Sequence, residues 1–289
     1  CSLELVWVRE VFWKREGNYP VLLPQATPSK SLKELRAWFF DQEFASDRAK
    51  VEKITIFGNF YFSRLPAEVG QLKLLKVFSA LQTALSQIEE GSLASCKELE
   101  EMILRVGRLE ELPEFLGKEL PELKTLVLTY QRLQTLPLSL QGLTNLRKLD
   151  LSGNNLGKFP SVIRFFKNLE VLEISAANLQ ELPDWIAELE NLRLLNLSDN
   201  QIQKIPESIG DLKKLEHLDL SGNQLTFVPS SIGQLENLQI INLSHNELSV
   251  LPREIGRWTN VIEINLSGNI LRELPPIPYL KKLKRLNVF

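Results

Sequence analysis

This chain of 289 residues is poor in the side chains that usually carry chemistry. It has two cysteines, Cys1 and Cys96, and two histidines, His217 and His245. Two cysteines do not suggest a disulfide framework, and neither histidine has a second His or a Cys at zinc-ligand spacing. The sequence also lacks GxSxG, P-loop and HExxH segments. We therefore expect no enzyme activity, no cofactor and no metal site.

The chain also lacks a strong net charge and any long apolar run. Its formal net charge is −2, so no general attraction to nucleic acid or to an anionic membrane is expected. It contains no run of apolar residues long enough to predict a membrane-spanning helix. With 44% hydrophobic and 24% charged residues, its composition is that of a globular protein with material for a long core.

The sequence does contain an internal repeat. Residues 192–214, 215–237 and 238–260 share the pattern LxxLxLxxNxLxxLPxxIGxLxx. A fixed period of this size predicts a solenoid. Further repeats start at Val51, Leu75, Leu99, Leu123, Leu146, Leu169 and Val261, and a partial eleventh starts at Leu283. We therefore assign residues 51–289 to a solenoid of ten repeats plus a partial eleventh.

The spacing within one repeat has a mechanical meaning. In residues 215–237, Leu218 and Leu220 alternate with polar residues, which predicts a short strand. Asn223 follows the strand, where its amide can bond backbone groups left unpaired in the turn. Pro229 then fixes φ at the start of a short helical turn. Stacked repeats would align the Asn side chains in a ladder and bury the apolar line that one repeat leaves exposed.

Residues 1–50 lack the repeat and are predicted to form an N-terminal cap. Alternation from Leu3 predicts a strand through about Lys14, and three prolines between Asn18 and Pro28 predict a loop. Ser31 begins a capping-box pattern, so we expect a helix from there to about residue 44. A solenoid end needs such a cap with a polar outer side.

These repeats, with their LPxxIG segment, resemble the 23-residue leucine-rich repeats of leptospiral and other bacterial proteins. They are also similar to repeat proteins of plants and animals that scaffold Ras-type signalling. The resemblance implies an α/β fold, a right-handed horseshoe with a parallel sheet on its concave face and short helical turns on its convex face. It implies non-catalytic binding of a protein ligand by a surface-exposed or secreted bacterial protein that contacts host proteins. The alternative is an intracellular, cytoplasmic signalling scaffold.

The start of the sequence bears on this choice. It begins with Cys1-Ser2 and has no initiator Met. A mature bacterial lipoprotein begins with a lipid-bearing Cys, so Cys1 predicts a lipoprotein held at the cell surface, and lipid there would be the one link to a membrane. The alternative is that the sequence begins at an arbitrary residue. Cys96 occupies a repeat position that normally holds Leu, so we expect a buried, inert thiol.

The ladder position departs from Asn mainly in the early repeats. Six of its ten residues are Asn; the exceptions are Thr83, Gly107, Gln131 and Ala177. Repeat two also has Glu89 where the pattern has Pro. We expect repeats two to four to be the least stable part of the solenoid, because contacts in a repeat array are between nearest neighbours.

The outward-facing side chains of the strands, here called the strand face, also change along the chain. From Ser152 onward one outward column is Ser at six successive repeats. The early repeats instead hold a predicted partner-binding set, here called the apolar patch: Phe57, Val77, Leu81, Ile103, Arg105, Val106, Val127 and Tyr130. Exposed apolar side chains with an Arg and a Tyr are typical of an interface centre. The alternative is that the cap covers part of this patch.

A second outward column holds acidic residues at Asp150, Glu173 and Asp219. Stacked strands lie about 4.8 Å apart, so neighbouring carboxylates there could share a cation. The favoured interpretation is a solvated wall without a metal.

Overall fold

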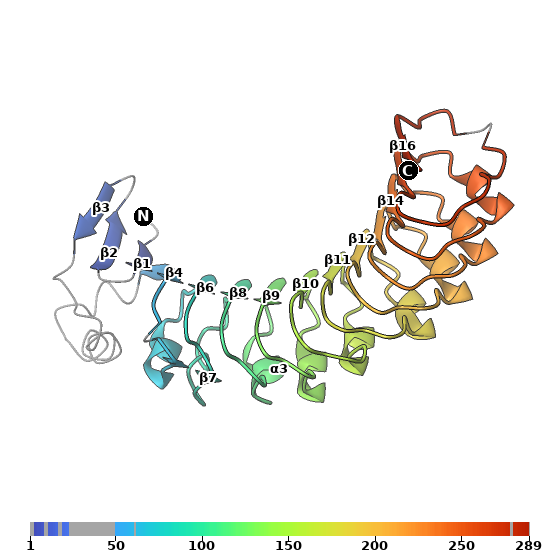
Figure 1. Ribbon diagram of the computed structural model, residues 1–289. Coiled ribbons are helices and arrows are strands. Elements are labelled where there is room, and N and C mark those ends of the chain that lie inside the picture. The colour runs from blue at the N-terminus through green and yellow to red at the C-terminus, as the bar shows by residue number, and fades with distance from the viewer. Residues whose placement is uncertain are drawn as a thin grey trace. The chain divides into compact units, whose positions relative to one another are not determined.

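The computed structural model describes residues 3–8, 11–16, 19–22, 50–60, 62–277 and 280–288. The chain divides into two compact units, residues 1–146 and 147–289, and each is described by itself (Figure 1). Among the described residues, no helix is long and apolar enough to cross a bilayer.

The first unit is built on one sheet with the strand order β3-β2-β1-β4-β6-β8-β9. Strands β1 and β4 to β9 of this sheet pair in parallel, and the register aligns Phe78, Met102 and Leu126 on its buried side. The strands are β1 (Leu3–Val8), β2 (Val11–Glu16), β3 (Tyr19–Leu22), β4 (Val51–Phe57), β6 (Val77–Leu81), β8 (Glu101–Arg105) and β9 (Thr125–Thr129).

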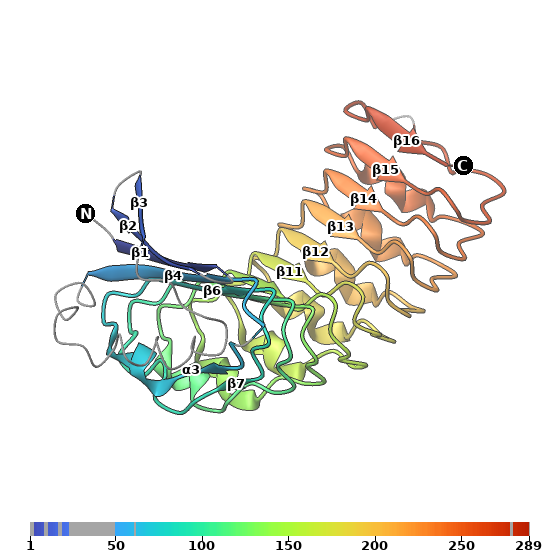
Figure 2. The same cartoon turned by 60° about the vertical axis from the view of Figure 1, so that its left-hand side comes forward.

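The N-terminal segment differs from the predicted strand and loop. In place of one strand through Lys14, β1 and β2 form an antiparallel pair, and β3 lies where a loop was predicted. β1 pairs in parallel with β4, so β1, β2 and β3 extend the sheet of the first unit beyond β4 (Figure 2). Alternation alone does not reveal a chain reversal within a run of strand-forming residues. The predicted helix from Ser31 lies outside the described residues, as does Cys1, and the role as a cap stays a prediction.

Short helical turns and a two-stranded sheet cover the other side of the first unit. They are β5 (Arg64–Leu65), η3 (Ala67–Gln71), β7 (Gln87–Ile88), α3 (Leu116–Glu119) and η4 (Leu138–Gly142). Pro66 precedes η3 and Pro137 precedes η4, both with extended backbone. Repeat two has Glu89 instead, and its amide bonds the Leu65 carbonyl at 3.0 Å in the strand pairing of β5 with β7.

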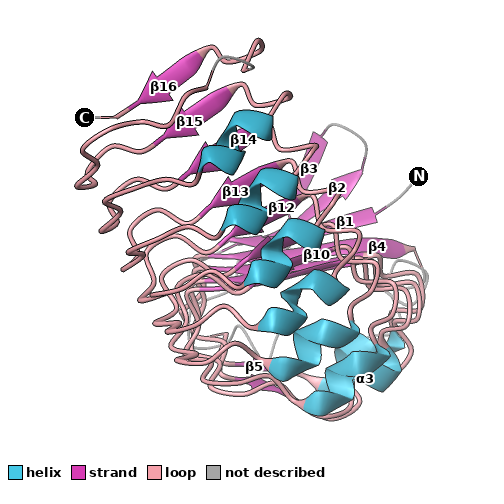
Figure 3. Ribbon diagram, turned by 90° about the vertical axis from the view of Figure 1, so that its right-hand side faces the viewer, coloured by secondary structure: helices cyan, strands magenta, loops and turns pink. Residues whose placement is uncertain are grey.

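The second unit repeats one strand and, in all but its last two repeats, one five-residue 3₁₀ helix. The parallel strands are β10 (Lys148–Asp150), β11 (Val171–Glu173), β12 (Leu194–Asn196), β13 (His217–Asp219), β14 (Ile240–Asn242), β15 (Glu263–Asn265) and β16 (Arg285–Asn287). The helices are η5 (Ser161–Phe165), η6 (Asp184–Glu188), η7 (Glu207–Asp211), η8 (Ser230–Gln234) and η9 (Arg253–Arg257). Figure 3 shows the helices stacked opposite the strands.

The predicted Asn ladder is present in the second unit. The Asn223 Nδ2 donates to the carbonyls of Leu197 and Leu220 at 3.0 Å, and its Oδ1 accepts from the Ile202 amide at 3.0 Å. Asn200 and Asn246 make the same contacts in their repeats. Each carboxamide therefore joins two successive turns where their backbones leave the sheet.

Strand length differs between the two units for a local reason. Most strand-centre residues of the second unit are Asp or Asn, whose side chain accepts the amide two residues on; Asn196 Oδ1 takes Ser198 N–H at 3.0 Å. This Asx turn accompanies the end of a three-residue strand, although β11, with Glu173 at this position, is equally short. The first unit has Ile103 and Val127 at this position, so its strands continue for five residues or more. The longer strands carry the residues of the apolar patch.

Candidate recognition surface

The structure exposes most of the apolar patch along strands of the first unit. Phe57 is 43% exposed, Val106 48% and Tyr130 61%. Arg105 is also exposed, while Val77, Leu81 and Ile103 are half-buried. These three half-buried residues and Phe57 and Arg105 lie on the neighbouring strands β4, β6 and β8. The parallel pairing therefore brings residues up to 48 positions apart in the sequence onto one surface.

Val127 is the exception, and its predicted exposure is wrong. It is only 2% exposed. Its side chain is short and β-branched, and the register places it beside Ile103 on β8. Side chains on adjacent strands stand about 5 Å apart, so larger neighbours in the same column can shield a small one. Val127 therefore offers little contact area to a partner.

A column of left-handed residues borders the patch. In every repeat, the residue just before the ladder position has a positive φ, between 50° and 72°. The column consists of Gly58, Gln82, Val106, Tyr130, Gly153, Ala176, Asp199, Gly222, His245 and Gly268. Gly, Asn, Asp and His tolerate this conformation, whereas for a β-branched residue it is a true outlier. Val106, with φ 57°, is the β-branched residue in the column.

Backbone hydrogen bonds on both sides hold Val106 in this conformation. Its N–H donates to the Thr129 carbonyl at 2.9 Å, and its carbonyl accepts from Thr83 N–H at 3.1 Å. The Tyr130 carbonyl likewise accepts from Gly107 N–H at 3.1 Å. Strain of this kind typically costs about 1–3 kcal/mol and persists only where the surrounding structure over-determines it. The repeat geometry therefore imposes the left-handed turn whatever side chain is present.

The polar groups of the patch have no partners within the described part of the chain. The Arg105 guanidinium makes no ion pair or side-chain hydrogen bond there, and neither does the Tyr130 hydroxyl. By contrast, Lys124 pairs with Glu100 at 3.0 Å and Arg132 approaches Glu110 at 3.8 Å. Arg105 and Tyr130 are thus available for an external partner.

Three further exposed residues adjoin the patch and were not predicted from sequence. Gln82 belongs to the left-handed column, while Phe60 and Arg108 come two residues after that column in their repeats. Phe60 is 58% exposed. The difference between these side chains and those at the same two positions of most later repeats is the sequence signal that identifies them.

The strand face of the second unit is polar and internally bonded. Its serines bond the strand-centre side chains; the Ser221 hydroxyl and amide both donate to Asp219, at 2.6 and 2.9 Å. Glu173 pairs with Lys148 at 2.7 Å, and Asn242 donates to Asp219 at 3.1 Å. These carboxylates already have partners, and the described residues contain no cluster of His, Cys, Asp or Glu that could hold a metal ion.

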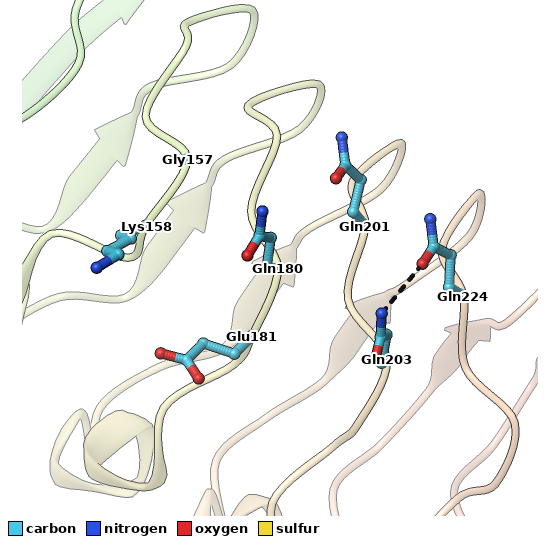
Figure 4. Close-up of a pocket in the computed structure, with 7 residues that line it drawn as sticks. All are labelled: Gly157, Lys158, Gln180, Glu181, Gln201, Gln203 and Gln224. Carbon is cyan, nitrogen blue, oxygen red and sulfur yellow. Dashed lines mark hydrogen bonds between the residues drawn. The ribbon is translucent and has the colours of Figure 1, made fainter.

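A polar groove of about 520 Å³ lies elsewhere on the second unit (Figure 4). Its lining consists of Gly157, Lys158, Gln180, Glu181, Gln201, Gln203 and Gln224. The amides of Gln203 and Gln224 bond each other at 3.4 Å, and all four glutamines are exposed. This groove is a solvated amide surface without an apolar anchor.

Cys96 is buried, as predicted from its repeat position. Its thiol is 0% exposed and contacts the Val69 carbonyl at 3.6 Å. Burial, with Glu119 nearby, raises the pKa of Cys96 to about 12. The thiol is therefore protonated at neutral pH and is not a nucleophile.

Comparison with known proteins agrees with the repeat architecture. Residues 185–289 match the family described as leucine-rich repeat region, and residues 97–156 match the family described as leucine rich repeat. No curated protein sequence matches this chain at a significant level.

Several solved structures match most of the length of this chain. A leucine-rich-repeat protein of Leptospira interrogans is 30% identical with a TM-score of 0.69, and the match covers 83% of this chain and 67% of that one. An internalin of Listeria monocytogenes is 20% identical with a TM-score of 0.58, and the match covers 85% of this chain and 76% of that one. A TDR receptor is 22% identical with a TM-score of 0.66, over 83% of this chain and 47% of the receptor. The last two show the shared fold alone. The predicted fold class, an α/β leucine-rich-repeat solenoid with parallel strands on one side and short helical turns on the other, is confirmed.

Proposed function

Because the chain belongs to the leucine-rich-repeat proteins, we propose that it is a protein–protein recognition module. One observation carries the proposal: the strand face of the first unit presents exposed apolar and arginine side chains, with Phe57, Arg105 and Tyr130 as its anchors. The strand face of the second unit presents serines that already bond Asp and Asn neighbours. Large apolar and Arg side chains carry most of the binding energy of interfaces, whereas small polar ones carry little.

The setting that we propose is the surface of a bacterium, or the medium around it, with a host protein as ligand. The LPxxIG repeat and the likeness to a Leptospira protein support this proposal. Lipid on Cys1 would provide the anchor. Under the alternative proposal the protein is a cytoplasmic scaffold, as the resemblance to Ras-linked repeat proteins suggests.

Two measurements separate these settings. Protein isolated from its native cells is analysed by mass spectrometry of its N-terminal peptide, and lipid on Cys1 supports surface display. Intact cells are then treated with protease. Cleavage of the protein before lysis supports exposure, and full protection supports the cytoplasmic scaffold.

Recognition itself is tested by capture with the intact chain. Extracellular host proteins and a bacterial cytosolic extract are offered separately, and bound proteins are identified. The double variant Arg105→Ala/Tyr130→Ala should lose the captured protein. The matched control, Ser198→Ala/Ser221→Ala, should retain it. A ligand that both variants hold equally would place recognition outside the strand face, and capture of none from either source would count against a recognition module.

A further inference from the structure

We infer that the apolar patch binds a polypeptide segment that combines acidic and apolar side chains, and that Val106 and Tyr130 occupy strained positions because they contact it. The inference rests on the proposed function and adds the partner's chemistry and the reason for the strain.

The first step compares residues that share the left-handed column. Gly occupies four of its ten positions, and Asp199 and His245 are residue types that tolerate this conformation. The other four residues, Gln82, Val106, Tyr130 and Ala176, do not belong to these types. Of these four, Val106 and Tyr130 carry large apolar side chains that are exposed. Since Val106 is 48% and Tyr130 61% exposed, the fold gains little burial from either side chain. A partner that covers the two side chains would bury the apolar area that the isolated fold leaves exposed.

The second step concerns charge. Arg105 and Arg108 are both exposed, and neither guanidinium has a bonded partner among the described residues. The acidic residue on the same strand, Glu101, is four positions from Arg105, about 13 Å along an extended chain. An arginine within an apolar surface favours a carboxylate, which it can bind with two parallel hydrogen bonds. The patch therefore selects an acidic partner.

The third step concerns spacing. The register places Phe57, Leu81 and Arg105 in one row at the ends of β4, β6 and β8. Neighbouring strands are about 4.8 Å apart. A partner carboxylate on Arg105 thus brings the residues beside it over Leu81 and Phe57, where apolar side chains fit. Val106 follows Arg105 in the chain, and Tyr130 follows Thr129, which pairs with Arg105 on β9. Both offer further apolar area next to Arg105, and the Tyr130 hydroxyl has no bonded partner among the described residues.

The test uses a display library of short random peptides as the probe, selected on the intact chain. We expect the enriched peptides to combine Asp or Glu with Leu, Phe or Trp. Their affinity should fall at least about tenfold, equivalent to about 1.4 kcal/mol, for Arg105→Glu and for Tyr130→Gly. Replacing the acidic residues of a selected peptide by Lys should have the same effect.

A second measurement separates a binding role from a structural one. Val106→Gly should raise the urea midpoint of unfolding, because glycine relieves the left-handed strain. The same variant should bind the selected peptide with at least about tenfold lower affinity. Val106→Asn keeps a side chain that tolerates this conformation and should weaken binding without loss of stability. Ala176→Gly, at the equivalent position of the second unit, is the matched control and should leave the affinity unchanged.

Two results would overturn the inference. Enriched peptides that are basic, or that bind Arg105→Glu as well as the parent, would place the site elsewhere while leaving protein recognition intact. A fall in the urea midpoint for Val106→Gly would show that the fold itself requires this side chain. Failure of the chain to capture any protein would instead contradict the proposed function.

Discussion

Gln131 extends its carboxamide into the space left by the missing side chain of Gly107. A Cβ atom built on Gly107 would collide with Gln131 Oε1. From this position the Gln131 Nε2 donates to the carbonyls of Leu104 and Thr129 at 3.2 and 3.3 Å, and its Oε1 accepts from Leu109 N–H at 3.2 Å. These are the bonds that Asn makes in other repeats. The two departures from the ladder thus compensate for each other.

This relationship predicts a strong coupling between the two residues. Gly107→Asn alone should destabilise the protein, because the new side chain occupies the space of the buried Gln131 amide. Gln131→Ala should cost about 1–3 kcal/mol, the usual penalty for buried polar groups that lose their partners. The double variant Gly107→Asn/Gln131→Asn restores the common ladder and should recover most of the loss. Urea unfolding of the four proteins in a double-mutant cycle measures the coupling; additive effects would show that the two positions are independent.

The ordinary ladder gives a second prediction. Asn223 is 7% exposed and bonds both its own turn and the preceding one. Asn223→Ala should therefore lower the free energy of unfolding by about 1–3 kcal/mol. The neighbouring exposed Gln224→Ala is the control and should change it by less than about 0.5 kcal/mol. A loss of that small size for Asn223→Ala would refute the structural role of the ladder.

Ala177 supplies the reverse experiment. It stands at a ladder position without an amide, and within the described residues the Leu156 N–H makes no hydrogen bond. In other repeats the equivalent amide binds the ladder Asn of the next repeat. Ala177→Asn should raise the urea midpoint or leave it unchanged, and should slow exchange of the Leu156 amide. Exchange as fast as in the parent would mean that the new side chain does not reach the ladder.

The glycine of the LPxxIG segment is a close-packing residue in some repeats and not in others. A Cβ on Gly210 would lie 2.5 Å from the Ser231 carbonyl oxygen, whereas one on Gly256 would lie 3.4 Å from its nearest neighbour, the Pro276 carbonyl. Gly210→Ala should cost at least about 1 kcal/mol through backbone displacement. Gly256→Ala is its matched control and should be neutral. Equal effects in thermal unfolding would contradict the packing argument.

Glu119 predicts a dependence of stability on pH. Burial raises the pKa of this carboxyl above its usual 4.5, against the opposing effect of Lys97, and its Oε2 is buried without a hydrogen bond. A raised pKa means that the folded state binds the proton more tightly. Stability should therefore fall as the pH rises from 4.5 to the raised value. Glu119→Gln should reduce this loss in urea titrations at successive pH values, and the exposed Glu122→Gln should not.

The sequence was sufficient for those features that one repeat specifies by itself. The period predicted the strand starts, the buried leucines and the bonds of Asn200 and Asn223, because each depends on neighbours at a fixed offset. Features that depend on the identity of two neighbouring repeats were not predicted. The pairing of Gly107 with Gln131 is one, and it removes part of the expected weakness of repeats two to four. Faster amide exchange in those repeats stays a prediction.

In the candidate site, too, features set within one repeat were predicted and features set between neighbouring repeats were not. Which columns face outward followed from alternation, so Phe57 and Arg105 were correctly placed on the surface. Tyr130 directly follows an outward column, and its exposure depends on the left-handed backbone instead. The burial of Val127 beside Ile103 depends on side-chain size across β8 and β9 and was missed. The left-handed column was missed because φ is not visible in a hydrophobic pattern. Only the backbone conformation of Val106 and of its equivalents in other repeats reveals this column.

The most direct test of the account is the affinity of a captured protein ligand for three forms of the chain, measured by titration calorimetry. Relative to the parent, Arg105→Ala/Tyr130→Ala should weaken binding by about a hundredfold or more, at about 1.4 kcal/mol per tenfold, while its unfolding midpoint stays near that of the parent. Ser198→Ala/Ser221→Ala should bind like the parent. If the serine variant loses the ligand and the Arg105/Tyr130 variant keeps it, the strand face of the first unit is not the recognition surface.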